Sequence, residues 1–218
     1  MAAVLVTGFE PFAGREKNGS RTLVQALTGG RLGGVAIATE VFPVRWAGFS
    51  ETIRRVAATR RPVLWLGLGE GRRPIPAFER VGKNRSGGPD VDGAGPPGSV
   101  LTEGGPVIRS TTMKWRESWF SDIDPPVRTS DDAGEYLCNS LIYFGLAYVS
   151  CPFGFVHLPV QGEREDASYV PLYLPAIERL IRRNLDAIAP PRPAGRQSLR
   201  GNREDGLTSD GLLSSEKA

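Results

Sequence analysis

The sequence predicts an α/β fold, a single-domain three-layer α/β/α sandwich around a mostly parallel, twisted sheet. Three apolar runs of strand length, at residues 2–9, 34–44 and 62–69, alternate with two segments of helical periodicity. The third run is apolar throughout, as expected of a strand that is covered on both faces. A β-α-β-α-β order of this kind is typical of a parallel sheet between two layers of helices.

The two helical segments of the first half can be bounded from their flanking residues. Ser20 is a candidate N-cap for a helix over residues 21–27, and Gly29 and Gly30 would end it. The second helix is expected over residues 46–59, where the apolar residues fall at helical spacing. Those apolar positions are Ile53, Val56 and Ala57.

The second half of the chain begins with a long segment rich in glycine and proline, residues 71–106. It is too long for a simple connector, so a functional loop and a disordered segment are both open. The remaining elements, in order, are a weak helix over 111–122, a short strand over 125–130, a strong helix over 132–149, a strand over 153–159 and a helix over 170–188. Residues 1–189 therefore form the expected domain, and residues 190–218 have the polar composition of a disordered tail.

Composition excludes several classes of function. The chain has 218 residues, and its net charge of +3 comes with no dense block of Lys and Arg, so no nucleic-acid partner is expected. No apolar run reaches the roughly 20 residues that span a bilayer, so no membrane partner is expected either. Two cysteines in a chain of this length make no disulfide framework, which favours a reducing, cytoplasmic location.

His157 is the only histidine, and it lies at the end of the expected strand over 153–159. It is either a partly buried residue with a satisfied hydrogen bond or a general base. A base needs a nucleophile, and Cys138 lies in the first turns of a helix expected to begin near Asp132 or Ala133. The N-terminus of a helix and a neighbouring imidazolium both favour a thiolate.

Glu79 is the best acidic candidate to orient the imidazole, because it closely follows the third strand. Each residue also has a structural interpretation, since Cys138 alone could be a core thiol and Glu79 alone a solvated charge. Only convergence of the three residues would favour catalysis. The intervening Gly-Leu-Gly-Glu-Gly-Arg-Arg segment resembles a nucleotide loop, but it lacks the lysine of a P-loop and the spacing of a dinucleotide fingerprint.

The sequence resembles the pyroglutamyl peptidase I family over roughly residues 3–187. The resemblance rests on five short motifs in this order: VTGFEPFAG, FERVGKN, PDVDG, DAGEYLCN and GFVHLP. It implies that Glu79, Cys138 and His157 form a catalytic triad and that Phe9 and Phe12 flank a lactam ring. It also implies removal of an N-terminal pyroglutamate from a peptide through a thioester, without metal or cofactor. Members of the family are often homo-oligomers, although no interface can be identified from this sequence.

The substrate loop departs from the family pattern. The family has an arginine ahead of its Pro-Asp-Asn segment, thought to help stabilise the oxyanion, whereas the matching slot here holds Gly87 or Gly88. Arg85 is the nearby residue able to replace it as a substrate-binding group. Loss of one oxyanion donor lowers turnover by about 10²–10³-fold. Two hypotheses therefore compete: a cysteine peptidase with reduced activity, and a catalytically weak or inactive relative that binds a small ligand or a partner.

Overall fold

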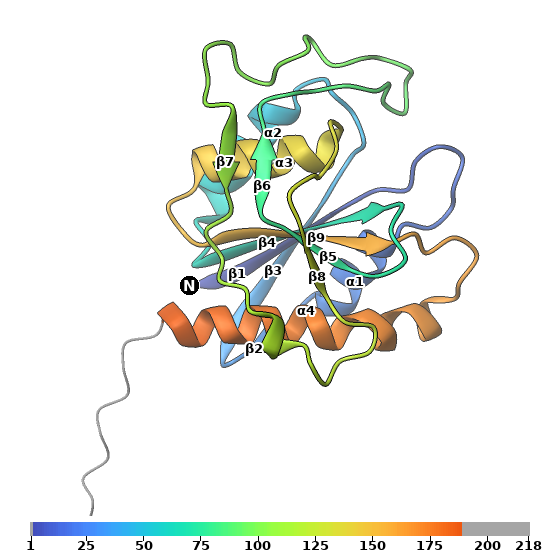
Figure 1. Ribbon diagram of the computed structural model, residues 1–218, viewed down its shortest axis with the longest axis vertical. Coiled ribbons are helices and arrows are strands. Elements are labelled where there is room, and N and C mark those ends of the chain that lie inside the picture. Colours follow the sequence, from blue (N-terminus) through green and yellow to red (C-terminus); the bar gives the residue numbers. More distant parts are fainter. Residues whose placement is uncertain (1, 189–218) are drawn as a thin grey trace, which may run out of the picture.

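A seven-stranded sheet forms the centre of the computed structural model, which describes residues 2–188 (Figure 1). The strand order is β2-β3-β1-β4-β9-β5-β8. The bounds are β1 Ala3–Phe9, β2 Arg31–Leu32, β3 Val35–Phe42, β4 Leu64–Gly71, β5 Ala77–Glu79, β8 Arg128–Ser130 and β9 Phe153–Pro159. Strands β3, β1, β4 and β9 are parallel. Strand β2 is antiparallel to β3, β5 is antiparallel to β9, and β8 is parallel to β5. The predicted α/β class with a mostly parallel sheet is confirmed.

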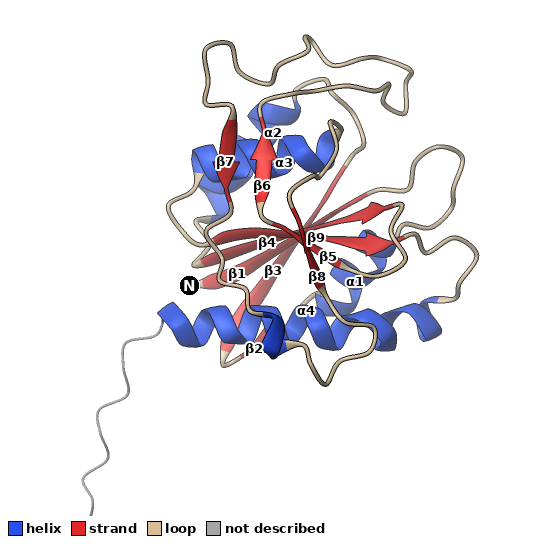
Figure 2. Ribbon diagram, in the orientation of Figure 1, coloured by secondary structure: helices blue, strands red, loops and turns tan. Residues whose placement is uncertain are grey.

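Four helices cover the two faces of this sheet (Figure 2). One layer contains α1 (Gly19–Leu27) and α4 (Asp166–Ile188), and the other contains α2 (Phe49–Arg60) and α3 (Leu137–Tyr148). Strand β1 contributes side chains to the cores on both faces of the sheet, because alternate side chains of a strand point to opposite faces. Val4 and Val6 belong to the core beneath α1 and α4, whereas Leu5 belongs to the core beneath α2 and α3.

The long Gly/Pro-rich segment contains structure that the sequence did not reveal. Besides β5 it holds β6 (Val81–Lys83), which pairs with β7 (Ile108–Ser110) as a separate two-stranded sheet beside α3. The loop between β6 and β7 is also anchored. The Asp90 carboxylate accepts a hydrogen bond from the Trp46 backbone N–H at 2.9 Å, and the Trp46 indole N–H donates to the Gly88 carbonyl at 2.8 Å. Residues 71–106 were expected to be either a functional loop or a disordered segment, and the structure shows them as an ordered loop.

Helix starts differ from the predicted ones for local reasons. Asn18, not Ser20, caps α1: its side-chain oxygen accepts from the Ser20 backbone N–H at 3.0 Å. Helix α3 begins at Leu137, because Gly134 has a positive φ of 77° that a helix cannot include. Helix α2 begins at Phe49 instead of residue 46, and α4 begins at Asp166 instead of residue 170.

The predicted weak helix over residues 111–122 is wrong. Only one 3₁₀ turn, Glu117–Trp119, forms there. The Trp115 and Phe120 rings stack at a centroid distance of 6.2 Å, and both pack against the core beneath α1 and α4. Packing of these two rings, instead of helical hydrogen bonds, holds the segment on the sheet. The expected tail over 190–218 lies outside the described residues.

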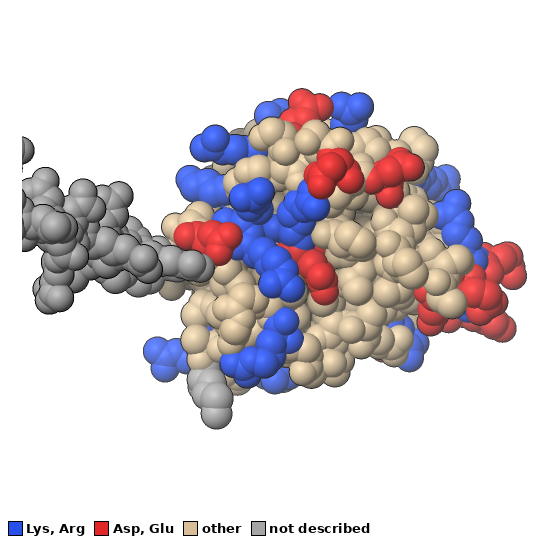
Figure 3. All heavy atoms as spheres, turned by 90° about the horizontal axis from the view of Figure 1, so that it is seen from below, with Lys and Arg blue, Asp and Glu red and all other residues tan. Residues whose placement is uncertain are grey.

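The face covered by α4 carries many charged side chains (Figure 3). Lysines and arginines are mixed there with acidic residues, and several are paired. Arg179 of α4 forms an ion pair with Asp122, and Arg128 of β8 lies 2.9 Å from Glu117. The positive charge on this face is therefore partly neutralised within the described residues.

Candidate active site

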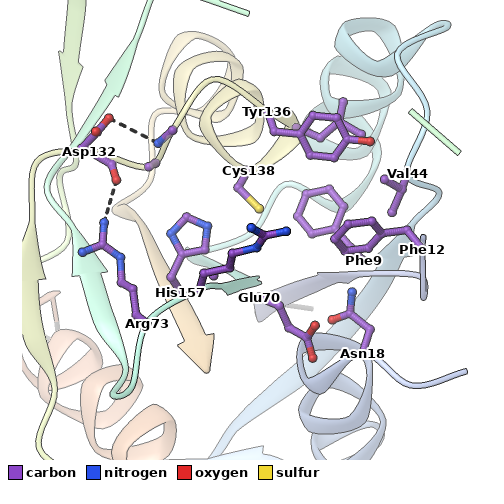
Figure 4. A pocket seen from close by; sticks show the side chains of 15 residues that line it. Phe9, Phe12, Asn18, Val44, Glu70, Arg73, Asp132, Tyr136, Cys138 and His157 are labelled. Carbon is purple, nitrogen blue, oxygen red and sulfur yellow. Dashed lines mark hydrogen bonds between the residues drawn. The ribbon is translucent and has the colours of Figure 1, made fainter. Parts of the chain in front are cut away.

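A cavity of about 590 Å³ lies at the carboxyl ends of β1, β4 and β9, where a parallel sheet characteristically carries its site (Figure 4). We call it the Cys138 cavity. Its lining comes from these three strand ends, from the loop after β1 and from the start of α3. Its side-chain lining is Phe9, Phe12, Asn18, Val44, Glu70, Arg72, Arg73, Asp132, Ala133, Tyr136, Leu137, Cys138 and His157.

Glu79 and His157 are brought together by the antiparallel pairing of β5 with β9. Ala77 lies opposite His157, and side chains two residues apart on a strand share a face, so Glu79 lies diagonally next to His157. The expected hydrogen bond is present, with 2.7 Å between His157 Nδ1 and Glu79 Oε1. Glu79 is fully buried, and Arg73 approaches the same carboxylate oxygen at 3.6 Å. The hydrogen bond to the buried Glu79 carboxylate therefore fixes the orientation of the imidazole ring.

Cys138 is the second residue of α3, so its sulfur lies at the helix N-terminus and faces the His157 ring across the cavity floor (Figure 4). Because Nδ1 of His157 contacts Glu79, the other ring nitrogen is the one left for the sulfur. Strand β4 makes room for this arrangement at Gly69, where a Cβ atom would lie 2.7 Å from Cys138 Sγ. A side chain at Gly69 would displace the sulfur.

The pKa of His157 reflects both burial and its two partners. The ring is only 5% exposed, and burial alone would lower its pKa. The negative charges of Cys138 and Glu79, together with their hydrogen bonds, outweigh burial and raise the pKa of His157 to about 9. This raised pKa favours a protonated imidazole beside the sulfur at neutral pH.

Asn139 explains why the start of α3 is held rigidly next to this pair. It is fully buried, and its side-chain oxygen accepts from the Lys83 backbone N–H at 2.8 Å. Its amide nitrogen donates to the carbonyls of Lys83 and Arg85 at 2.8 and 2.9 Å. Three hydrogen bonds thus fasten the first turn of α3 to β6 and the residues after it. Sequence reasoning assigned no role to Asn139, although it follows Cys138 directly.

Phe9 and Phe12 both line the Cys138 cavity, but they are held differently. Phe9 ends β1, is 3% exposed, and packs against Phe42 and Phe49 at centroid distances of 6.1 Å. Phe12 lies in the loop after β1, is partly exposed, and lies 6.3 Å from the Tyr136 ring. Of these two phenylalanines, one therefore belongs to the core and the other to a loop.

Arg85 does not line the Cys138 cavity. Its guanidinium lies 2.7 Å from Asp132 and 3.4 Å from Glu135. Arg72 and Arg73, which follow β4, line the cavity instead, and Arg72 forms no hydrogen bond or ion pair with its side chain among residues 2–188. The sequence indicated this arginine pair only as part of a nucleotide-like loop; its position directly after a parallel strand was the signal that could have identified it.

Neither a metal centre nor a membrane helix is found in the part of the chain that the structure describes. Between residues 2 and 188, no three His, Cys, Asp or Glu side chains cluster in a way that could hold a metal ion. No helix in that range combines the length and the apolar character needed to cross a bilayer.

Residues 2–168 match the family model described as pyroglutamyl peptidase. The chain belongs to this family. It is 32% identical over 171 residues to a pyrrolidone-carboxylate peptidase of Halalkalibacterium halodurans, with 73% of this chain and 85% of the relative covered. A pyrrolidone-carboxylate peptidase of Thermococcus kodakarensis is also 32% identical over 171 residues, covering 74% and 82%. Membership of the pyroglutamyl peptidase family makes the chain a cysteine-type exopeptidase.

Solved structures of the same family have the same fold. A mutant pyrrolidone carboxyl peptidase of Pyrococcus furiosus superposes with a TM-score of 0.76 at 23% identity, covering 86% of this chain and 100% of the other. The pyrrolidone carboxyl peptidase of Thermococcus litoralis gives a TM-score of 0.75 at 24% identity, covering 85% and 94%. At these identities the likeness establishes the fold.

Proposed function

We propose that the chain removes an N-terminal pyroglutamate from peptides and that Cys138, His157 and Glu79 carry out the reaction. The observation that supports this most is the sequence of contacts from the cavity lining to a buried carboxylate. Cys138 and His157 line the cavity, and the buried Glu79 carboxylate lies behind the imidazole, 2.7 Å from its Nδ1. This is the nucleophile–base–orienting group order of a covalent hydrolase.

In the proposed reaction, the Cys138 thiolate attacks the carbonyl carbon that joins pyroglutamate to the next residue. The carbonyl electrons move to oxygen, giving a tetrahedral oxyanion. The C–N bond then breaks, and the His157 imidazolium gives its proton to the leaving amine. The remaining thioester is attacked by water, which loses a proton to the now neutral His157. Pyroglutamate leaves, and the thiolate–imidazolium pair is restored.

Phe9 and Phe12 supply a flat, apolar site for the lactam ring in this proposal. A five-membered lactam lacks charge, so burial between aromatic rings favours it over a charged N-terminal amine, whose desolvation is costly. The cavity therefore favours an N-terminus blocked by ring closure.

The oxyanion is expected to accept hydrogen bonds from the start of α3 and from Arg72. The first N–H groups of a helix have no partner within the helix, and Cys138 lies in that first turn. Arg72 lines the cavity, and its guanidinium forms no ion pair within residues 2–188. Arg85, paired with Asp132, is less available for this role than the sequence suggested.

We expect Arg72→Ala to lower kcat for a pyroglutamyl amide by about 10²–10³-fold, because removal of one oxyanion donor has an effect of that size. Arg85→Ala is the matched control and should stay within about twofold of the parent, since surface substitutions away from the site change little. Steady-state kinetics of both variants give the answer. An equal loss of kcat in the two variants, or a larger loss for Arg85→Ala, would indicate that Arg85 donates a hydrogen bond to the oxyanion.

The pKa of His157 sets an alkaline limit on turnover. A pKa raised to about 9 means that the imidazolium is present below this pH and is lost above it. Since the leaving amine needs that proton, kcat/KM for a pyroglutamyl amide should fall about tenfold per pH unit above this pKa. The measurement is a pH profile from about pH 6 to about pH 11, a range that brackets the expected limit. A profile that still rises well above the His157 pKa would contradict this acid role.

Hydrolysis of a fluorogenic pyroglutamyl amide tests the proposed function directly. Prolyl amide with the same fluorophore is the control substrate, because it keeps the ring but has a charged amine and no lactam carbonyl. We expect turnover of the first and none of the second. Slow turnover with tight binding of the lactam would favour the alternative of a catalytically weak ligand-binding protein.

The two cysteines form no disulfide, which fits a reducing, cytoplasmic location. A peptide bearing pyroglutamate is the proposed partner. Residues 1–189 are proposed as one folding unit, and assembly of identical chains can be tested by light scattering.

A further inference from the structure

Glu70 is a second buried carboxylate in the lining of the Cys138 cavity. It lies in β4, its side chain is 1% exposed, and neither Cys138 nor His157 is among its hydrogen-bond partners. One carboxylate oxygen accepts from the Gly19 backbone N–H at 2.5 Å and from the Gln161 backbone N–H at 2.9 Å. The other oxygen forms an ion pair with Arg15. A buried charge is tolerated only with such partners.

Arg15 links the buried Glu70 carboxylate to Phe12. Its guanidinium carbon lies 4.3 Å from the centroid of the Phe12 ring, within cation–π range, and its Nε donates to the Phe12 carbonyl at 3.4 Å. Arg15 itself does not line the Cys138 cavity. Both the ring and the backbone of Phe12 are thus tied through Arg15 to the end of β4.

The loop that carries Phe12 needs such an anchor. Residues 10–18 contain no helix or strand, and Ala13 has a positive φ of 56°, an uncommon conformation for a residue with a Cβ atom. Phe9, by contrast, is fixed by β1 and by core rings. Without a fixed Phe12, only Phe9 of the two phenylalanines proposed to flank the lactam ring would be held in place.

We propose that Glu70 and Arg15 are positioning residues that hold Phe12 in place and thereby set affinity for the acyl part of the substrate. The inference rests on the proposed function of the cavity. Because Arg15 acts through Phe12 and not on the reacting atoms, its loss raises KM and leaves kcat and the pH profile unchanged. Glu70 also accepts a hydrogen bond from the backbone N–H of Gln161, which closely follows His157 in the chain. A change at Glu70 could therefore affect His157 as well as Phe12, so substitution of Arg15 is the more specific test.

The test is a double-mutant cycle with Arg15→Met, Phe12→Ala and the double variant, measured with a pyroglutamyl amide. Arg15→Met should raise KM about tenfold with kcat within about twofold, a size consistent with loss of a partly desolvated cation–π contact. In the Phe12→Ala background the same change should have no further effect. Arg15→Lys, which keeps the charge beside Glu70, should recover part of the loss.

Arg60→Met is the matched control, because Arg60 of α2 pairs with Glu40 of β3 at 2.8 Å on a partly exposed surface, outside the loop that carries Phe12. It should leave KM unchanged. Glu70→Gln should raise KM like Arg15→Met, and thermal unfolding of each variant verifies that it is folded. Equal effects of Arg15→Met in the two backgrounds, or a fall in kcat with a shifted pH profile, would overturn the proposal.

A second readout separates this inference from the proposed function. If the parent does not hydrolyse the amide, the proposed function fails, and the cycle is then measured by protection of Cys138 from iodoacetamide by 2-pyrrolidone. Weaker protection in Arg15→Met than in the parent, by about tenfold in the half-protecting concentration, supports the positioning role. Equal protection of both, or no protection of the parent, overturns it.

Discussion

Cys138→Ala should lower hydrolysis of a pyroglutamyl amide by at least about 10⁴-fold, because removal of a nucleophile leaves only binding and oxyanion stabilisation. Among residues 2–188 there is no second thiol at the site. Cys151 precedes β9 and lines a different part of the surface, next to Tyr148 and Val149. Single-turnover and steady-state assays on purified Cys138→Ala measure the loss.

Cys151→Ala is the matched control and should keep the parental rate. Burial raises the pKa of the Cys151 thiol, whereas the Cys138 sulfur lies beside a protonated imidazole. Iodoacetamide should therefore label Cys138 well before Cys151 at neutral pH. If Cys138→Ala keeps more than a few per cent of the parental turnover, the thioester route is wrong.

Glu79→Gln should lower kcat/KM by about 10²–10⁴-fold, the range expected when the orienting carboxylate of a triad becomes an amide. The carboxylate stabilises the imidazolium, and an amide of the same shape does not. Loss of Glu79 lowers the pKa of His157, so the alkaline limit should move from about 9 toward neutral pH. The pH profile of kcat/KM measures this shift along with the rate.

Glu40→Gln is the control for the loss of one carboxylate, because Glu40 pairs with Arg60 at 2.8 Å on a partly exposed surface. It should leave both the rate and the alkaline limit unchanged. A Glu79→Gln variant that keeps the parental alkaline limit would show that Cys138 alone holds the proton on His157.

The sequence was sufficient for the parts of the fold that have strong periodicity. Continuous apolar runs predicted β1, β4 and β9, because strands covered on both faces need apolar side chains at nearly every position. Strands β5 and β6 were missed because such short segments carry no measurable period. The start of α3 was placed too early because the sequence does not show that Gly134 adopts a positive φ.

The types of residue in the candidate site could be predicted from the sequence, but the contacts that bring these residues together could not. The sole histidine, a cysteine near a helix start and an acid after a strand indicated Cys138, His157 and Glu79. Their proximity depends on the pairing of β5 with β9, two strands far apart in the sequence, so it could not be read from local patterns. Arg72 and Asn139 were missed because their roles depend on where the folded chain points their side chains.

The strand order also constrains when this site can exist during synthesis. Strand β5 pairs in the large sheet only with β9 and β8, so it cannot join β4 until β9 is made. Strands β1, β3 and β4 can pair as soon as they leave the ribosome. Glu79 and Cys138 are thus translated before His157, and the pairing of β5 with β4 through β9 is possible only once β9 has been made. A nascent chain that stops before Phe153 lacks His157, so under the proposed reaction it has neither the general acid nor the general base, and β9 is the last strand that the proposed site requires.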